Sequence, residues 1–130
     1  MSDVGYRLLD AIGRRDFDEI ETCFAPGASV RILTPHQLRA LSGPVEAASR
    51  FRTWFEEMEA FELLDSDVSE IADRVRIRWH TLGRDARKGL QENEHTGYAE
   101  IGGDGLIVAL NVSCAGFRPV EAADEDRPRG

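Results

Sequence analysis

The side chain best suited to do chemistry in this sequence is the imidazole of His95, because it titrates near neutral pH and has apolar neighbours. The surrounding residues 93–119 predict a β-hairpin with its turn at residues 102–105. Pairing Ile101 with Leu106 across this turn gives a register in which alternate residues share a face. In that register the face consists of His95, Gly97, Ala99, Val108, Leu110, Val112 and Cys114, with His95 opposite Val112. We predict that this mostly apolar face forms the wall of a pocket.

Several polar groups could assist His95. Desolvation in an apolar pocket favours the neutral imidazole, which could then act as a general base. Tyr6 and Asp10 are four residues apart on a predicted helix and share a face, so Asp10 could be an acid/base partner. Asp65 or Asp67 would add a carboxylate if its strand turned it inward. The alternatives are a histidine satisfied by one hydrogen bond and a solvated helix face.

Two tryptophans and a stripe of cations have other possible roles. Trp54 and Trp79 could stack on a planar ligand or pack in the core. The strand predicted at residues 74–82 alternates, and its cationic side carries Arg74, Arg76, Arg78 and His80. Since Glu94 and Glu100 lie on the facing side of the next strand, we predict a cross-strand charged face rather than an anion site.

Composition limits the classes of partner. The 130 residues include 16 Lys and Arg against 24 Asp and Glu, and the net charge of −8 disfavours nucleic acid. The sequence has neither an apolar run of membrane-spanning length nor the features of a signal peptide, so we expect a cytoplasmic protein with no membrane partner. We expect Cys23 and Cys114 to be reduced and buried. The three histidines are too scattered for a metal site, and we expect no metal and no cofactor.

The elements that would position these residues run from helices to strands. The pattern predicts a helix at residues 3–14, a short helix capped by Asp16 and ended by Pro26, and a long helix from Pro44. The predicted apolar face of the long helix contains Val45, Ala48, Phe51, Phe55 and Met58, widened by Trp54 and Phe61. Predicted strands cover residues 28–34, 37–41, 61–71 and 74–82 and the hairpin, with a loop at residues 83–89. This order is typical of an α+β domain at residues 1–119, followed by an acidic tail at residues 120–130 that we expect to be disordered.

The order of the landmarks resembles the nuclear-transport-factor-2-like superfamily and, within it, the SnoaL-like domains. The landmarks are the helix corner at residues 15–18 (RDFD), residues 24–30 (FAPGASV), 43–47 (GPVEA), 73–79 (DRVRIRW) and 104–108 (DGLIV). Residues 114–119 (CAGFRP) look like a group of bacterial SnoaL-like proteins without an assigned activity. The resemblance implies a cystatin-like, cone-shaped roll, in which a strongly bent mixed or antiparallel sheet wraps around the long helix and encloses a pocket. It also implies a homodimer formed through the sheet.

That superfamily includes ketosteroid isomerases, polyketide cyclases and limonene epoxide hydrolases, besides non-catalytic members. The positions that match the isomerase's base, tyrosine and protonated aspartate are Ile32, Leu8 and Gly97. The position that matches the cyclase aspartate is Val112, one residue from Asn111. The epoxide hydrolase's Asp–Arg–Asp set is not visible on the inward faces.

The sequence therefore predicts a protein that binds a small apolar or aromatic molecule without those catalytic carboxylates. The predicted ligand-binding residues are Tyr6, Trp54, Phe55, Met58, Trp79, Gly97, Leu110, Val112 and Cys114. One alternative is a cyclase-like or isomerase-like enzyme that uses His95 with Asp10. A second alternative is a dimerisation module whose cavity is filled.

Overall fold

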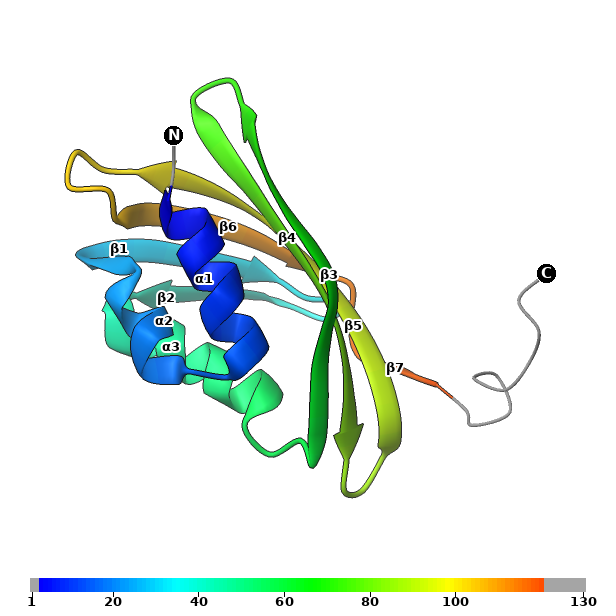
Figure 1. The fold of residues 1–130 in the computed structure, drawn as a ribbon. Helices are drawn as coiled ribbons and strands as arrows, with labels where there is room; N and C mark the ends of the chain where they lie inside the picture. The colour runs from blue at the N-terminus through cyan, green and yellow to red at the C-terminus, as the bar shows by residue number, and fades with distance from the viewer. Residues whose placement is uncertain (1–2, 121–130) are drawn as a thin grey trace.

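The computed structural model describes residues 3–120, which form three helices packed against one side of a strongly curved sheet of seven strands (Figure 1). The elements are α1 (Asp3–Arg14), α2 (Phe17–Thr22), β1 (Phe24–Leu33), β2 (Leu38–Ser42), α3 (Gly43–Phe55), β3 (Ala60–Ile71), β4 (Arg74–Asp85), β5 (Gly89–Ile101), β6 (Ile107–Cys114) and β7 (Arg118–Pro119). This arrangement confirms the predicted α+β roll with three helices. The predicted tail, apart from Val120, lies outside the described residues.

The sheet is mixed and open. Its strand order is β2-β1-β6-β5-β4-β3, and β7 pairs separately with β5. Strands β1 and β6 run parallel, whereas the other neighbours are antiparallel. Helix α1 packs on β3 and β4, and α3 packs on β1 and β2. The core therefore lies between the helices and the concave face of the sheet.

The corner between α1 and α2 links the helices to each other. Asp16 caps α2 as predicted, because its Oδ1 accepts a hydrogen bond from the amide of Glu19 at 3.1 Å. Arg15 adopts a positive φ of 53° at this corner. Its guanidinium donates to the carbonyls of Phe55 and Met58 at 3.0 and 2.8 Å, which satisfies acceptors at the end of α3.

The apolar face of the long helix was only partly predicted. Ala48, Phe51 and Phe55 are buried, but Val45 is 68% exposed in the first turn of α3. Met58 is buried, although it lies beyond the end of the helix at Phe55. The predicted apolar face was therefore too long: Val45 at its start is exposed, and Met58 at its end is not part of the helix.

The register of the β5–β6 hairpin differs from the prediction by two residues. Ala99 pairs with Leu110, Gly97 with Val112, and His95 with Cys114. One residue of the shift arises at the turn, where Ile101 pairs with Ile107 rather than with Leu106, and the second arises from a bulge between Glu100 and Ile101. Ile107 is consequently buried, and Val108, which we expected to face inward, is 39% exposed.

The strand prediction for residues 74–82 is confirmed, but that strand is longer. Val75, Ile77, Trp79 and Thr81 are buried along one face of β4. The predicted loop at residues 83–89 is wrong, because β4 continues to Asp85 and β5 begins at Gly89. The Asp85 carboxylate accepts hydrogen bonds from the amides of Arg87 and Lys88, which closes a much shorter turn.

Candidate functional site

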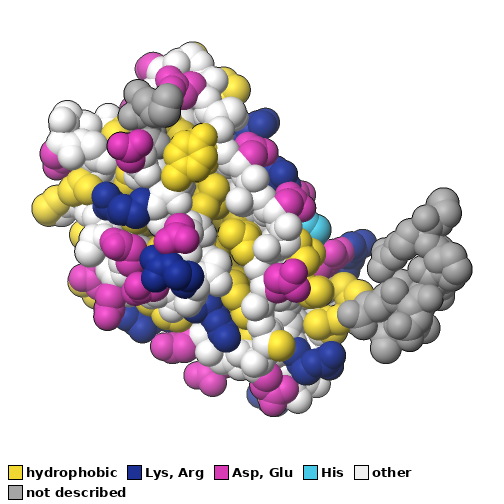
Figure 2. Space-filling model, viewed as in Figure 1, with side chains coloured by type: hydrophobic (Ala, Val, Ile, Leu, Met, Phe, Trp, Pro, Cys, Tyr) yellow, Lys and Arg dark blue, Asp and Glu magenta, His cyan; other side chains and the backbone are white. Residues whose placement is uncertain are grey.

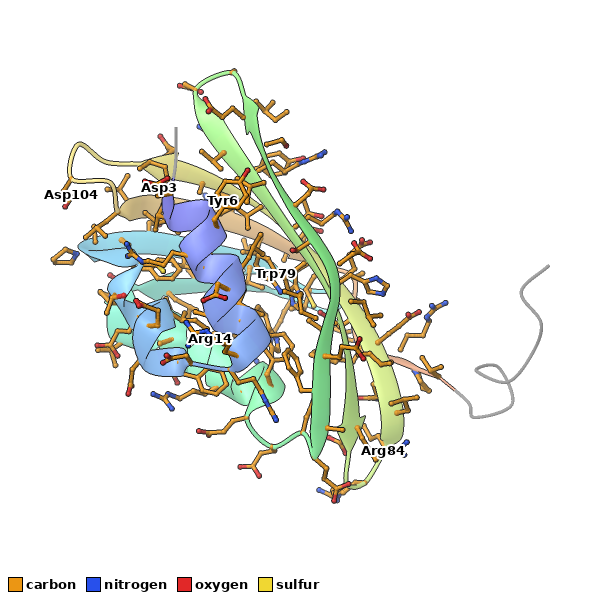
Figure 3. All side chains as sticks on the ribbon, in the orientation of Figure 1. Asp3, Tyr6, Arg14, Trp79, Arg84 and Asp104 are labelled. Carbon is orange, nitrogen blue, oxygen red and sulfur yellow. The ribbon has the colours of Figure 1, made fainter. Side chains whose placement is uncertain are left out.

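His95 faces the interior of the fold and is fully buried on β5. Four aromatic rings surround it. The ring centroid of Trp54 lies 4.2 Å from that of His95, and Trp79 stacks on the imidazole at 5.2 Å with an interplanar angle of 20°. Phe55 and Phe117 approach edge-on at 6.3 and 6.4 Å. Trp79 lies between the sheet and the helices, as Figure 3 shows. We call this arrangement the aromatic cage.

Burial strongly changes the acid–base chemistry of His95. Desolvation lowers the pKa of the imidazole from 6.5 to about 3, because no partner compensates the charge of the protonated form. The side chain is therefore neutral at physiological pH, with one N–H donor and one ring-nitrogen acceptor. Within residues 3–120, neither ring nitrogen has a hydrogen-bond partner.

Polar side chains cluster around this position. The buried polar residues of the described chain are Thr81, Gln91, Asn93 and His95. Gln91, Asn93 and His95 alternate along β5 and so share its inner face, and Thr81 of β4 pairs with Asn93. We call these four residues the polar wall. The inner face of the sheet is thus apolar except at one end, where these four side chains can form hydrogen bonds.

Several atoms of this region lack partners among the described residues. They are both ring nitrogens of His95, the Oδ1 of Asn93 and the indole Nε1 of Trp79. The amide nitrogen of Asn93 donates to the Sγ of Cys114 at 3.6 Å, which is a weak interaction. Native proteins rarely leave buried polar atoms without partners, so a group of four in one region indicates a site for a polar contact.

A hollow of about 550 Å³ lies immediately outside the aromatic cage. It is lined by Thr34, Pro35, His36, Trp54, Lys88, Cys114, Ala115, Gly116, Phe117, Arg118 and Pro119. Trp54 and Phe117 belong to both regions, because each lines the hollow and also contacts His95. Both rings are only partly buried. They therefore connect the surroundings of His95 with a space of the size that small-molecule sites usually have.

A second hollow of about 330 Å³ shares Ala115, Gly116 and Arg118 with the first and also borders Asn93 of the polar wall. Its charged side chains are already paired. His80 contacts Asp65 and Glu92 at 3.1 and 3.2 Å, and Glu92 also pairs with Arg118. Because these groups satisfy one another, this hollow is a weaker candidate for a ligand site.

The proposed partners of His95 are not brought to it. The side chain of Asp10 is 66% exposed and pairs with Arg14 at 2.8 Å, and Tyr6 is 57% exposed on the same helix. This corresponds to the solvated helix face. Asp65 and Asp67 point outward and bind Arg78 at 2.7 and 3.2 Å. None of these carboxylates supplies an acid or base to the cage.

The apolar part of the predicted pocket wall is packed rather than open. Leu110, Val112 and Cys114 are buried on the inner face. A Cβ on Gly97 would lie 2.9 Å from the Cδ1 of Leu110, so this glycine permits close packing and does not border free space. Of the other predicted ligand contacts, Trp54 and Cys114 line the hollow, Trp79 and Phe55 lie in the cage, and Met58 is buried beyond α3. The space between α3 and the sheet is therefore occupied by aromatic side chains.

The outer face of β3, β4 and β5 carries the predicted network of charges. Arg78 contacts three carboxylates, those of Asp65, Asp67 and Glu94, and Arg74 lies 3.9 Å from Glu100. These pairs confirm the cross-strand charged face and account for its cations without an anionic ligand. Acidic and basic side chains are also interspersed over the face of the molecule that Figure 2 shows.

Two further findings concern membranes and metals. No helix within residues 3–120 has both the length and the apolar character needed to cross a membrane. In the same part of the chain, no group of three His, Cys, Asp or Glu side chains is placed to hold a metal ion.

Comparison with known proteins relates the chain to solved structures only. No family model and no curated protein matches the sequence. A protein from Xanthomonas campestris pv. campestris, provisionally described as a polyketide cyclase, matches with a TM-score of 0.69 and 16% identity over 85% of this chain and 86% of that chain. A hypothetical protein with a ketosteroid isomerase-like fold from Catenulispora acidiphila has a TM-score of 0.68 and 10% identity, over 86% of this chain and 85% of that chain.

An NTF2-like protein of unknown function from Exiguobacterium matches at a TM-score of 0.61 and 19% identity, over 92% of this chain and 99% of that chain. The chain has the nuclear-transport-factor-2-like fold. This confirms the fold that the resemblance implied. Because the identities are low and the fold accommodates many functions, the function must be argued from the site itself.

Sequence reasoning found His95 but missed its polar neighbours. Asn93 and Gln91 are two and four residues before His95, and strict alternation places all three on one face. The predicted hairpin face began at His95 and so excluded them. Extending the same alternation toward the start of the strand would have found the polar wall.

Proposed function

We propose that this protein binds a small, planar, largely apolar molecule next to His95, by way of the hollow that Trp54 and Phe117 line. The observation that supports this most is a fully buried imidazole with no hydrogen-bond partner in the described chain, enclosed by aromatic rings that also border a hollow of about 550 Å³. A planar ligand would stack on these rings, and its polar group would reach His95.

Access to His95 requires movement of side chains rather than of the backbone. Trp54 and Phe117 are partly exposed, and rotamer changes of such residues are fast. Gly116, which precedes Phe117, has a φ of 94°, and no regular structure holds residues 115–117. These features favour a ligand that displaces the two rings and takes over part of their packing.

The alternative of an enzyme that uses His95 as its base is less well supported. A pKa of about 3 means that protonating His95 at neutral pH costs free energy, which makes it a weak base in this environment. Among residues 3–120, no carboxylate contacts the imidazole to offset that cost. Binding needs only a neutral hydrogen-bonding group, which His95 already is.

The protein contains its own reporter for this test. Its two tryptophans, Trp54 and Trp79, both contact His95, so the tryptophan fluorescence comes entirely from the aromatic cage. We expect naphthalene to change this emission saturably in the native protein. His95→Leu is expected to change the affinity, whereas His80→Leu, the same substitution on the outer face, is expected to leave it unchanged.

Two results would contradict the proposed function. One is the absence of a saturable change with both naphthalene and the lactam quinolin-2(1H)-one. The other is an equal effect of His95→Leu and His80→Leu, because His80 lies among charged groups away from the cage.

We also propose the homodimer through the sheet that the resemblance implies. Tyr98 and Val108 are exposed on the outer face and would supply apolar contacts between two sheets. Sedimentation velocity of the native protein and of Tyr98→Asp tests this. A native protein that sediments as a monomer would overturn it.

A further inference from the structure

We propose that the ligand is an uncharged planar ring system that carries a hydrogen-bond donor and an acceptor side by side, as a lactam does. The protein would recognise it by hydrogen bonds to that one edge of the ring system. This inference rests on the proposed binding function and specifies the chemistry of the ligand. It is based on the buried polar atoms near His95 that have no hydrogen-bond partner within the described residues.

The unpartnered atoms supply both kinds of hydrogen-bonding group. The Oδ1 of Asn93 is an acceptor, and the Nε1 of Trp79 is a donor. Neutral His95 adds one donor and one acceptor, and either ring nitrogen can carry the proton. A ligand that only donates, or only accepts, would therefore leave part of this set unsatisfied.

These atoms also lie close together on adjacent strands. Trp79 and His95 are direct partners in the β4–β5 ladder, and their rings stack. Asn93 precedes His95 by two residues on the same face, and its Nδ2 is oriented toward the Sγ of Cys114. Within the described residues, Oδ1 accepts no hydrogen bond and so is available to a ligand. Neighbouring positions of the two strands therefore present a donor and an acceptor on the same face of the sheet.

Of the other two residues of the polar wall, Thr81 and Gln91, Thr81 has a hydrogen-bond partner within the chain. The hydroxyl of Thr81 donates to the backbone carbonyl of Asn93 at 3.5 Å, so it already has a partner. Within the polar wall, the Thr81 hydroxyl therefore has a hydrogen-bond partner, whereas Asn93 Oδ1 and the His95 nitrogens do not. Thr81 consequently provides a matched control position on the same surface.

A charged ligand fits this site poorly. The rings of Trp54, Phe55, Trp79 and Phe117 surround His95, and within the described residues no ion pair reaches the imidazole. Burying an ion without an opposite charge is far more costly than burying a neutral amide. A purely apolar ligand is accommodated by the rings, but it leaves all four polar atoms without partners.

Three probes of the same shape separate these contributions. Quinolin-2(1H)-one carries an N–H beside a carbonyl, 1-methylquinolin-2-one lacks the donor, and naphthalene lacks both groups. We expect the lactam to bind about tenfold more tightly than its N-methyl derivative, the effect of losing one buried hydrogen bond. Isothermal titration calorimetry of the native protein measures all three affinities.

Variants locate the preference. Asn93→Leu keeps the side-chain size and removes the open acceptor, so we expect the lactam preference to fall to about one while naphthalene still binds. Thr81→Val is expected to retain the preference. Circular dichroism of each variant checks that the fold is intact, and Asn93→Ser serves as a second variant if Asn93→Leu does not fold.

The outcomes distinguish the two proposals. Equal binding of all three probes would overturn the proposed recognition of a lactam edge, but it would leave the proposed binding function in place. Binding of none of them would overturn both. A preference that survives Asn93→Leu and Asn93→Ser, or that is lost in Thr81→Val, would also overturn the assignment of this edge.

Discussion

Acid should destabilise this protein through His95, beginning below about pH 6.5. The folded-state pKa of the imidazole is about 3, against an ordinary value of 6.5. Below pH 6.5 the unfolded chain binds a proton at this position that the folded chain does not bind until about pH 3. Stability therefore falls as the pH falls through this window, by about 1.4 kcal/mol per pH unit.

The size of the effect follows from that slope. At pH 4.5, two units below 6.5, the loss from His95 alone is about 2.7 kcal/mol, which is a large share of the stability of a small domain. The pKa values of Asp65 and Asp85 are lowered from 3.8, by hydrogen bonds from His80 and Arg78 and from the turn amides respectively. Their stabilisation is lost at more acidic pH than this window.

The assay compares the native protein with His95→Leu. Urea unfolding followed by circular dichroism at pH 6.5, 5.5 and 4.5 gives the free energy of unfolding for each. Contributions from all other groups are common to both proteins and cancel in the difference. We expect the native protein to lose about 2.3 kcal/mol more than His95→Leu between pH 6.5 and pH 4.5, since about 0.4 kcal/mol of the effect is already present at pH 6.5. Equal pH slopes for the two proteins would refute the assignment of a buried, unpartnered imidazole.

Three substitutions test the packing that holds the site. Arg15→Met removes the hydrogen bonds to the last carbonyls of α3 and should reduce the free energy of unfolding by about 1–3 kcal/mol in urea denaturation, because buried acceptors lose a charged donor. Asp16→Ala removes the α2 cap and should cost about 1 kcal/mol, measured in the same way; an unchanged stability would contradict the cap. Gly97→Ala should cost about 1–3 kcal/mol and lower the melting temperature, because the new Cβ meets Leu110; a neutral result would mean that the wall has free space there.

The parts of the fold that follow local rules could be predicted from the sequence. The alternation from Val75 to Thr81 identified the buried face of β4, and Asp16 marked the start of α2 through its capping geometry. Both signals depend on residues close together in the chain. The charged outer face followed in the same way, since Arg78 and Glu94 alternate with buried neighbours.

The errors have tertiary causes. The bulge next to Ile101 depends on hydrogen bonds within the turn, where Gly102 donates to the carbonyl of Leu106, and a two-residue register shift leaves the facing pattern nearly unchanged. Asp10 lies on an amphipathic helix, and the sequence does not specify which flank of that helix meets the sheet. The filling of the interior by Trp54 and Phe55 is likewise a matter of packing between distant elements.

The most direct test of the binding proposal is to observe the nitrogens of His95 while a ligand is added. Long-range nitrogen–proton NMR spectra of the histidine-labelled protein resolve the three imidazoles, and His95→Leu assigns one of them. We predict that quinolin-2(1H)-one shifts the ring nitrogens of His95 saturably and leaves those of His36 and His80 in place. Unchanged His95 signals at saturating probe, or shifts confined to the other two histidines, would contradict a binding site at the polar wall.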